Sequence, residues 1–177
     1  MKTRFLILAN FILLSFSWAQ SANHSQSIQG NFSSQNILAY QENSVSLVQN
    51  FYDYLTLYSN ETDSELKLQI QENIRSIVHS SQFEIPDFTR NVQSTISLNE
   101  FLRKIENQKY QFQVENMKTP QSIQFDYWVN QYDLKIQGGN EVSTQRLEQV
   151  IQFRPIEKQF GSRSKTVWEL KLSSIKN

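Results

Sequence analysis

The apolar residues of this chain change their spacing once, near Tyr110, and this change limits the folds that the chain can adopt. Before that point they recur every three or four residues, which is the period of an amphipathic helix. After it they alternate with polar residues, as in a β-strand with one buried face. Helices followed by a run of strands predict an α+β domain in which three helices pack on one face of a bent antiparallel sheet.

Three helices are expected before the change. The first carries an apolar stripe from Val45 to Tyr58. Two capping boxes, Thr62-Asp63-Ser64-Glu65 and Ser97-Leu98-Asn99-Glu100, predict where the second and third helices begin, because each Ser or Thr hydroxyl can accept from an amide three residues later. Two short strands are expected between the second and third helices, at 83–88 and 92–96.

Four longer strands are expected after the change. In the stretch 122–137 the apolar set shifts by one residue after Val129, and such a slip predicts a β-bulge that bends the strand. Gly138-Gly139-Asn140 predicts a hairpin turn, and Gly161 marks the loop before the last strand.

The first 19 residues have the layout of a secretory signal peptide. Two basic residues precede the apolar stretch 5–16, and small residues at Ser17 and Ala19 predict cleavage between Ala19 and Gln20. The alternative is a membrane anchor, but the apolar stretch has 12 residues, whereas a spanning helix needs ~20. We therefore expect a secreted or periplasmic protein.

The residues that follow the predicted signal peptide divide into two parts. Residues 20–43 are rich in Ser, Gln and Asn without a sustained period, so we expect a flexible leader. Residues 44–177 are enough for a single α+β domain with one core.

Composition excludes several classes of function. Loss of Lys2 and Arg4 from 17 basic residues leaves 15, against 17 acidic residues, so the exported chain has a net charge of −2. Since no basic run stands out, we expect no nucleic-acid partner and no membrane contact after signal removal. The chain has no cysteine, which suits a bacterial envelope, and only two distant histidines. We expect no metal and no cofactor.

The element order and the bent strand make residues 45–175 resemble the cone-shaped domains of the nuclear transport factor 2-like superfamily, which includes ketosteroid isomerase-like and SnoaL-like proteins. The leader and composition are also similar to those of small secreted Bacteroidetes-type proteins. The resemblance implies a cone of helices on a bent sheet. It does not choose an activity, because the superfamily contains isomerases, dehydratases, cyclases and many non-enzymatic binding modules.

Enzymes of this superfamily place an Asp, Glu or His on the inner face of the sheet. The residues that we expect on this face include no carboxylate and no histidine, so no catalytic residue is predicted. They are Tyr110, Phe112, Val114, Ile123, Phe125, Tyr127, Val129, Tyr132, Leu134, Ile136, Leu147, Gln149, Ile151, Phe153, Trp168, Leu170 and Leu172.

A few residues are candidates for binding. Four inward residues with polar tips either contact a small ligand or hydrogen-bond to one another: Tyr52, Tyr127, Tyr132 and Gln149. Trp128 is expected on the outward face, either as the anchor of a homodimer or covered by its neighbours. His79, at the end of the second helix, either acts as a base or complements the helix dipole.

Three functions agree with these observations. The first is an exported, non-catalytic domain that binds a small ligand or a protein partner. The second is an isomerase-like or cyclase-like enzyme that uses Tyr127 or Tyr132, with or without His79. The third is a homodimeric interaction module that pairs through Trp128.

Overall fold

The structure is a computed structural model of the chain, and it describes residues 27–90, 94–120 and 122–176. The predicted signal peptide, its cleavage site at Ala19 and Gln20, and the start of the predicted leader lie outside these residues. The described part is an α+β domain, as predicted, and its elements follow in this order: α1 (Ile28–Asn31), α2 (Ser34–Asn60), α3 (Ser64–Ile77), β1 (Glu84–Pro86), β2 (Thr95–Ser97), α4 (Leu98–Ile105), β3 (Gln111–Lys118), β4 (Tyr127–Gly138), β5 (Glu141–Phe160) and β6 (Arg163–Lys176).

Strands β3 to β6 form one antiparallel sheet in the order β3-β4-β5-β6, and β1 pairs with β2 in a small second sheet. Gly138 pairs with Glu141, and Phe160 pairs with Arg163, so both connecting turns contain two residues. Gly139 and Gly161 occupy these turns with φ angles of 60° and 63°. Such turns favour glycine because its missing Cβ permits positive φ. Both predicted turns are confirmed.

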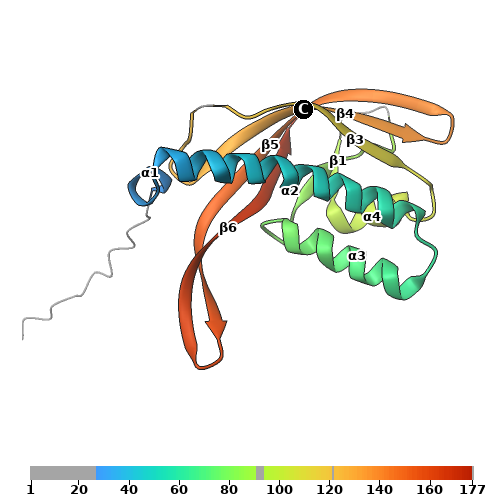
Figure 1. Cartoon of the computed structure of the whole chain (residues 1–177). Coiled ribbons are helices and arrows are strands. Elements are labelled where there is room, and N and C mark those ends of the chain that lie inside the picture. The colour runs from blue at the N-terminus through green and yellow to red at the C-terminus, as the bar shows by residue number, and fades with distance from the viewer. Residues whose placement is uncertain (1–26, 91–93, 121, 177) are drawn as a thin grey trace, which may run out of the picture.

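Helix α2 crosses the inner face of the sheet, with α3 and α4 beside it (Figure 1). The predicted stripe of α2 supplies five buried side chains, and only its first member, Val45, stays half-buried. Ser97 caps α4 as predicted, since its hydroxyl accepts from the amide of Glu100. Helix α3 begins at Ser64. Its cap is Asp63 rather than Thr62, because the Asp63 carboxylate accepts from the backbone amides of Glu65 and Leu66.

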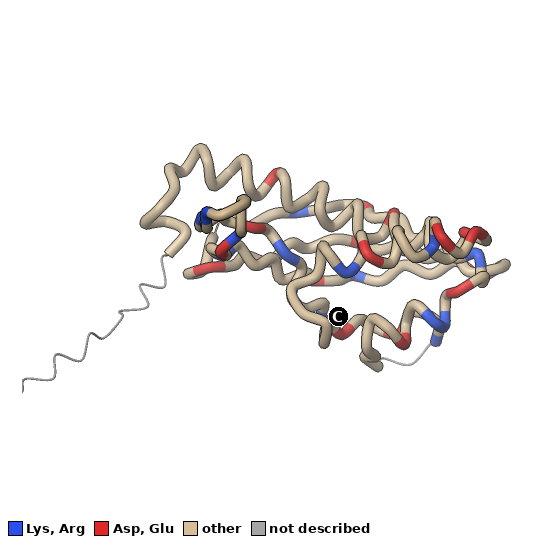
Figure 2. The backbone as a smooth tube through the Cα atoms, turned by 90° about the horizontal axis from the view of Figure 1, so that it is seen from below, with Lys and Arg blue, Asp and Glu red and all other residues tan. Residues whose placement is uncertain are grey.

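The predicted flexible leader is wrong over residues 28–43, which are helical except at Phe32 and Ser33. Ile28 is fully buried, and Phe32 and Tyr40 pack against Phe153 with ring centroids 5.2 and 4.3 Å away. Residues 27–41 carry no charge, which is visible as the long uncharged stretch at the start of the described tube in Figure 2. The sequence pattern fails here because α1 and α2 are separate helices, so the apolar residues follow no single period.

The predicted bulge in the stretch 122–137 is also wrong. Strand β4 starts at Tyr127 and keeps one phase, with five alternate residues facing inward and buried: Trp128, Asn130, Tyr132, Leu134 and Ile136. Register shifts lie instead in the two edge strands, near Asn116 in β3 and between Leu172 and Ile175 in β6. Bulges are common at sheet edges because the unpaired side of the strand tolerates the extra residue.

This register corrects the predicted inner face near the start of β4. Tyr127 is 37% exposed, whereas Trp128 is only 1% exposed, so the two predicted orientations are wrong. Val129 lies on the outer face with Tyr127, and Ile123 and Phe125 precede the strand. The remaining members of the predicted inner set are buried or pack against the core as half-buried side chains.

Candidate functional site

Two of the four predicted binding residues meet inside the domain. The hydroxyls of Tyr52 on α2 and Tyr132 on β4 lie 2.8 Å apart, and both residues are at most 2% exposed. Burial raises the pKa of both phenols, and it does so for Tyr52 against the opposing effect of its hydrogen bond. Both tyrosines therefore stay protonated near neutral pH, and neither is suited to act as a general base.

A second buried polar cluster explains why Trp128 faces inward. The indole Nε1 of Trp128 and the amide Nδ2 of Asn130 donate to the hydroxyl oxygen of Ser44, over 3.1 and 3.0 Å. The Ser44 hydroxyl in turn donates to the backbone carbonyl of Gln41. Sequence reasoning missed Ser44, although its spacing of four residues from Val48 and eight from Tyr52 places it on the same helix face.

Gln149 extends this cluster. With Ser44, Trp128 and Asn130 it forms what we call the polar strip, but it makes no contact that suggests an open site. Its Nε2 donates to the backbone carbonyls of Val150 and Ser174, both at 3.1 Å. Asn130 is its cross-strand neighbour. The side-chain oxygens Asn130 Oδ1 and Gln149 Oε1 are buried without a hydrogen-bond partner among the described residues. Since neither residue has exposed surface, both are closed to a ligand in this structure.

The other predicted site residues do not join this strip. Tyr127 points to the opposite face of the sheet from Tyr132. His79 is exposed just after α3, and its backbone amide donates to the carbonyl of Leu172. The structure therefore does not bring Tyr127, Tyr132 and His79 together. Because Trp128 is buried, its indole is not available as the predicted anchor of a dimer.

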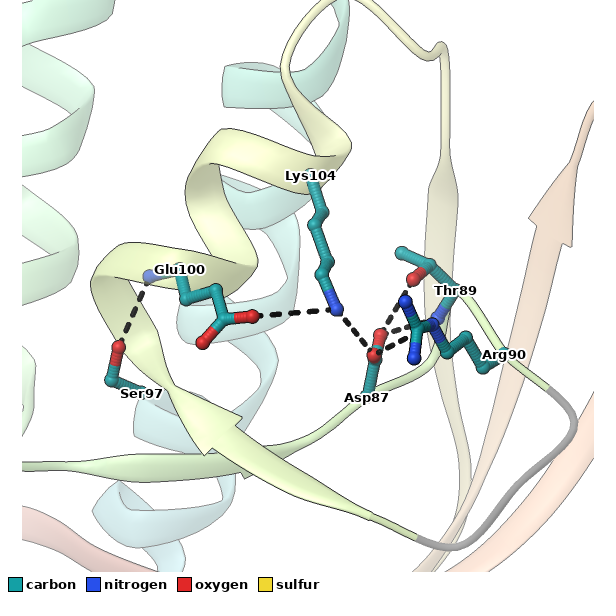
Figure 3. A network of polar contacts seen from close by, with 6 residues as sticks. All are labelled: Asp87, Thr89, Arg90, Ser97, Glu100 and Lys104. Atoms are coloured by element: carbon teal, nitrogen blue, oxygen red, sulfur yellow. Dashed lines mark hydrogen bonds and ion pairs between the residues drawn. The ribbon is translucent and has the colours of Figure 1, made fainter.

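Sequence reasoning also missed a buried carboxylate, Asp87, on the loop between β1 and β2 (Figure 3). Its Oδ2 contacts Lys104 Nζ of α4 at 2.6 Å, and its Oδ1 accepts from the hydroxyl of Thr89 at 2.6 Å and from the Thr89 amide at 3.2 Å. Burial alone would raise the pKa of Asp87, but the hydrogen bonds from Lys104 and Thr89 outweigh it, so the pKa is lowered. Asp87 is therefore charged near neutral pH and anchors the loop rather than acting as a base. The sequence signal was the Asp two residues before Thr89, which is typical of an Asx turn.

An open groove of about 380 Å³ lies on the outer face of the sheet, against the segment that joins β3 to β4. It continues into a smaller hollow of about 190 Å³ that shares Lys118 and Gln131 with it. The larger groove is lined by Lys118, Thr119, Pro120, Ser122, Gln124, Tyr127, Val129, Gln131 and Glu148.

The wall of this groove is held in place by the segment that was predicted to be a leader. Gln41 Nε2 donates to the carbonyl of Pro120 at 3.0 Å. The amide of Ile28 donates to the carbonyl of Phe125, also at 3.0 Å. Because α1 and α2 fix both ends of the segment, the groove has a defined shape rather than depending on an unsupported loop.

The groove combines an aromatic ring with amide and charged groups. Gln131 Nε2 donates to Glu148 Oε1 at 2.8 Å, so these two side chains are already aligned across β4 and β5. Gln152 of β5 is the cross-strand partner of Tyr127 in β4. Its Oε1 is buried without a hydrogen-bond partner among the described residues. Lys118 and Glu148 balance each other in charge, so the lining favours a neutral polar ligand.

Within residues 27–90, 94–120 and 122–176, no three His, Asp or Glu side chains are grouped closely enough to hold a metal ion. Across the same residues, no helix has both the length and the apolar content needed to cross a membrane.

Comparison of the chain with protein-family models and with curated proteins gave no match. The functional argument therefore depends on the geometry of the described residues.

Proposed function

We propose that this chain is an exported, non-catalytic binding domain that takes a small, neutral, polar ligand in the groove on the outer face of its sheet. The observation that carries the proposal is the contrast between the two faces. The inner face is closed by paired or fully buried groups, such as Tyr52 with Tyr132. The outer face has a shaped groove beside Tyr127, whose ring is exposed.

The chemistry of the lining suggests which ligand fits. A tyrosine ring offers a flat apolar face and a polar tip. The side-chain amides of Gln124 and Gln131 each offer donors and an acceptor. A ring compound that carries hydroxyl or amide groups matches this combination, because it presents C–H groups to the aromatic face and mixed donors and acceptors to the amides.

Export and the finer fold assignment are parts of the same proposal. The order of the first 19 residues supports a cleaved signal peptide and a secreted or periplasmic location. Three helices beside a four-stranded antiparallel sheet support a nuclear transport factor 2-like cone. The buried positions of the described strands β3–β6 hold no Asp, Glu or His, which supports a binding role over an acid–base enzyme.

The proposal is tested by saturation-transfer NMR with a fragment library of neutral hydroxyl- and amide-bearing ring compounds. We expect hits whose signals disappear in Tyr127→Ala. The matched control is Leu57→Ala, which removes an exposed side chain from a different groove of about 410 Å³ between α2 and β3. The control should retain the same hits.

Two results would overturn the proposal. One is a library without any hit on the folded wild-type chain. The other is loss of binding in Leu57→Ala with retention in Tyr127→Ala, which would place the ligand in the groove beside α2.

A further inference from the structure

The far ends of β5 and β6 form a two-stranded arm, which we define as residues 154–160 and 163–169 with the turn between them. Strand β4 stops pairing with β5 at Gln152, and β6 is the outermost strand, so no described strand pairs with either edge of the arm. All of residues 157–166, the arm tip, are exposed. In Figure 1 this tip extends away from the helices, at the bottom of the view.

The arm has an unusual distribution of charge. Strand pairing sets Lys158 opposite Lys165 and Phe160 opposite Arg163, and side-chain alternation puts all four on the outer face of the hairpin. Glu157 is the only acidic residue of the arm tip. It lies on the opposite face, where its carboxylate accepts from the hydroxyl of Ser164. The tip therefore has a net charge of +2, from three basic residues and one acidic, whereas residues 20–177 together have −2.

An apolar ring stands among these cations. Phe160 is 53% exposed beside the turn at Gly161, and Lys165 Nζ lies 6.0 Å from the centre of its ring. Lys158 is ion-paired with Glu169, which lies on the same face nearer the base of the arm, and a two-stranded hairpin gains little stability on its own in water. An anionic partner above this face would pair with Arg163 and Lys165, and an apolar layer below the anions would accept the ring.

We infer that the arm tip docks on the surface of an anionic lipid bilayer. Arg163 and Lys165 contact the lipid phosphates, and Phe160 enters the boundary between headgroups and acyl chains. Basic residues beside an exposed aromatic or aliphatic side chain are the combination that interfacial segments use. A soluble anionic polymer would use the cations equally well but would gain nothing from Phe160. This inference is independent of the ligand groove.

The expectation of no membrane contact rested on the lack of a basic run along the chain. Successive cations of the arm tip are at most five positions apart in the sequence. Phe160 and the turn lie between Lys158 and Arg163, so the three cations do not form a basic run. They gather on one face only when the hairpin forms.

The test is cosedimentation with vesicles of phosphatidylcholine alone and of phosphatidylcholine with about one third phosphatidylglycerol. The wild-type chain should bind the anionic vesicles, and salt should weaken the binding. Arg163→Gln/Lys165→Gln should weaken it about 25-fold, at about fivefold per cation. Phe160→Ser should weaken it by about tenfold. All variants share the same N-terminus, so any binding by the apolar stretch 5–16 cancels in the comparison.

Matched controls place the same chemical changes elsewhere. Arg103→Gln/Lys176→Gln removes two exposed charges outside the arm, and Val142→Ser removes an exposed apolar side chain from the other hairpin. Both controls should bind like the wild type. Circular dichroism on each variant separates a change in binding from a loss of the fold.

Four outcomes would overturn the inference. Binding that is equal for charged and neutral vesicles, or equal for arm and control variants, would remove the arm from membrane contact. No binding by the wild type would do the same. Binding of dextran sulfate that is as tight as that of the vesicles and insensitive to Phe160→Ser would assign the arm to an anionic polymer instead.

Discussion

Ser44→Ala is the substitution that tests the inner face of the domain most directly. The Ser44 hydroxyl is fully buried and accepts from both Trp128 Nε1 and Asn130 Nδ2. Without it both donors stay buried without that partner, and each unsatisfied buried donor costs about 1–3 kcal/mol. Alanine returns about 0.5 kcal/mol through its higher helix propensity. We therefore expect the free energy of unfolding to fall by about 1.5–5.5 kcal/mol.

Urea unfolding followed by circular dichroism measures this change. With a slope of about 2 kcal/mol per molar urea for a domain of this size, the midpoint should fall by about 1–3 M at unchanged slope. The matched control is Ser46→Ala, because Ser46 is exposed on the same helix two residues later. The control should change stability by no more than about 0.5 kcal/mol.

A double-mutant cycle separates the hydrogen bond from other effects. In the background of Trp128→Phe the Ser44→Ala change leaves one buried donor fewer without its acceptor, so its cost should fall by about 1–3 kcal/mol. If Ser44→Ala and Ser46→Ala unfold at the same urea concentration, Trp128 does not face α2 and the register of β4 given above is wrong. The cycle thus distinguishes the observed register from the one that the sequence predicted.

Two further predictions concern the anchored loop and the tight turn. Because the pKa of Asp87 is lower in the folded chain than in the unfolded chain, the contribution of Asp87 to stability is fully present above pH ~3.9 and disappears as pH falls through the lowered pKa. Asp87→Asn should therefore cost about 1.5–3 kcal/mol of stability near neutral pH. A difference in melting temperature between Asp87→Asn and the wild type that did not narrow in acid would contradict this assignment. Gly138→Ala should destabilise by about 1–3 kcal/mol, since its Cβ would collide with the ring of Tyr110, whereas Gly30→Ala meets no atom within 4 Å and should unfold thermally at or above the wild-type temperature.

The parts of the fold that were predictable are those fixed by neighbouring residues. The cap at Ser97 needs only a hydroxyl three residues before Glu100, and the turn at Gly139 needs only a residue that accepts positive φ. The α+β class followed from the period of the apolar residues over whole segments. None of these depends on a partner that is distant in the sequence.

The phase of β4 was not predictable in the same way. Both alternating sets of β4 contain apolar residues, Tyr127 and Val129 in one and Trp128 and Tyr132 in the other. The inward set also carries Asn130, which a rule based on hydrophobicity places outside. What decides the phase is Ser44, a hydroxyl 84 positions before Trp128 that satisfies both the indole and the amide. The two candidate tyrosines that contact each other are Tyr52 and Tyr132. For both, the apolar pattern predicted the inward orientation that the structure has.

The surface sites depend on pairing that composition cannot reveal. Net charge counts Lys158, Arg163 and Lys165 together with acids elsewhere in the chain, so the total is nearly neutral. Side-chain alternation puts Glu157 on one face of the hairpin, and strand register puts Lys158 against Lys165 on the other. The outer groove arises similarly, because Gln41 of α2 donates to the carbonyl of Pro120, which lines the groove beside β4. A local excess of charge or a shaped groove is thus a property of the register, and a one-residue shift in β5 against β6 would replace the basic face of the arm with a mixed one.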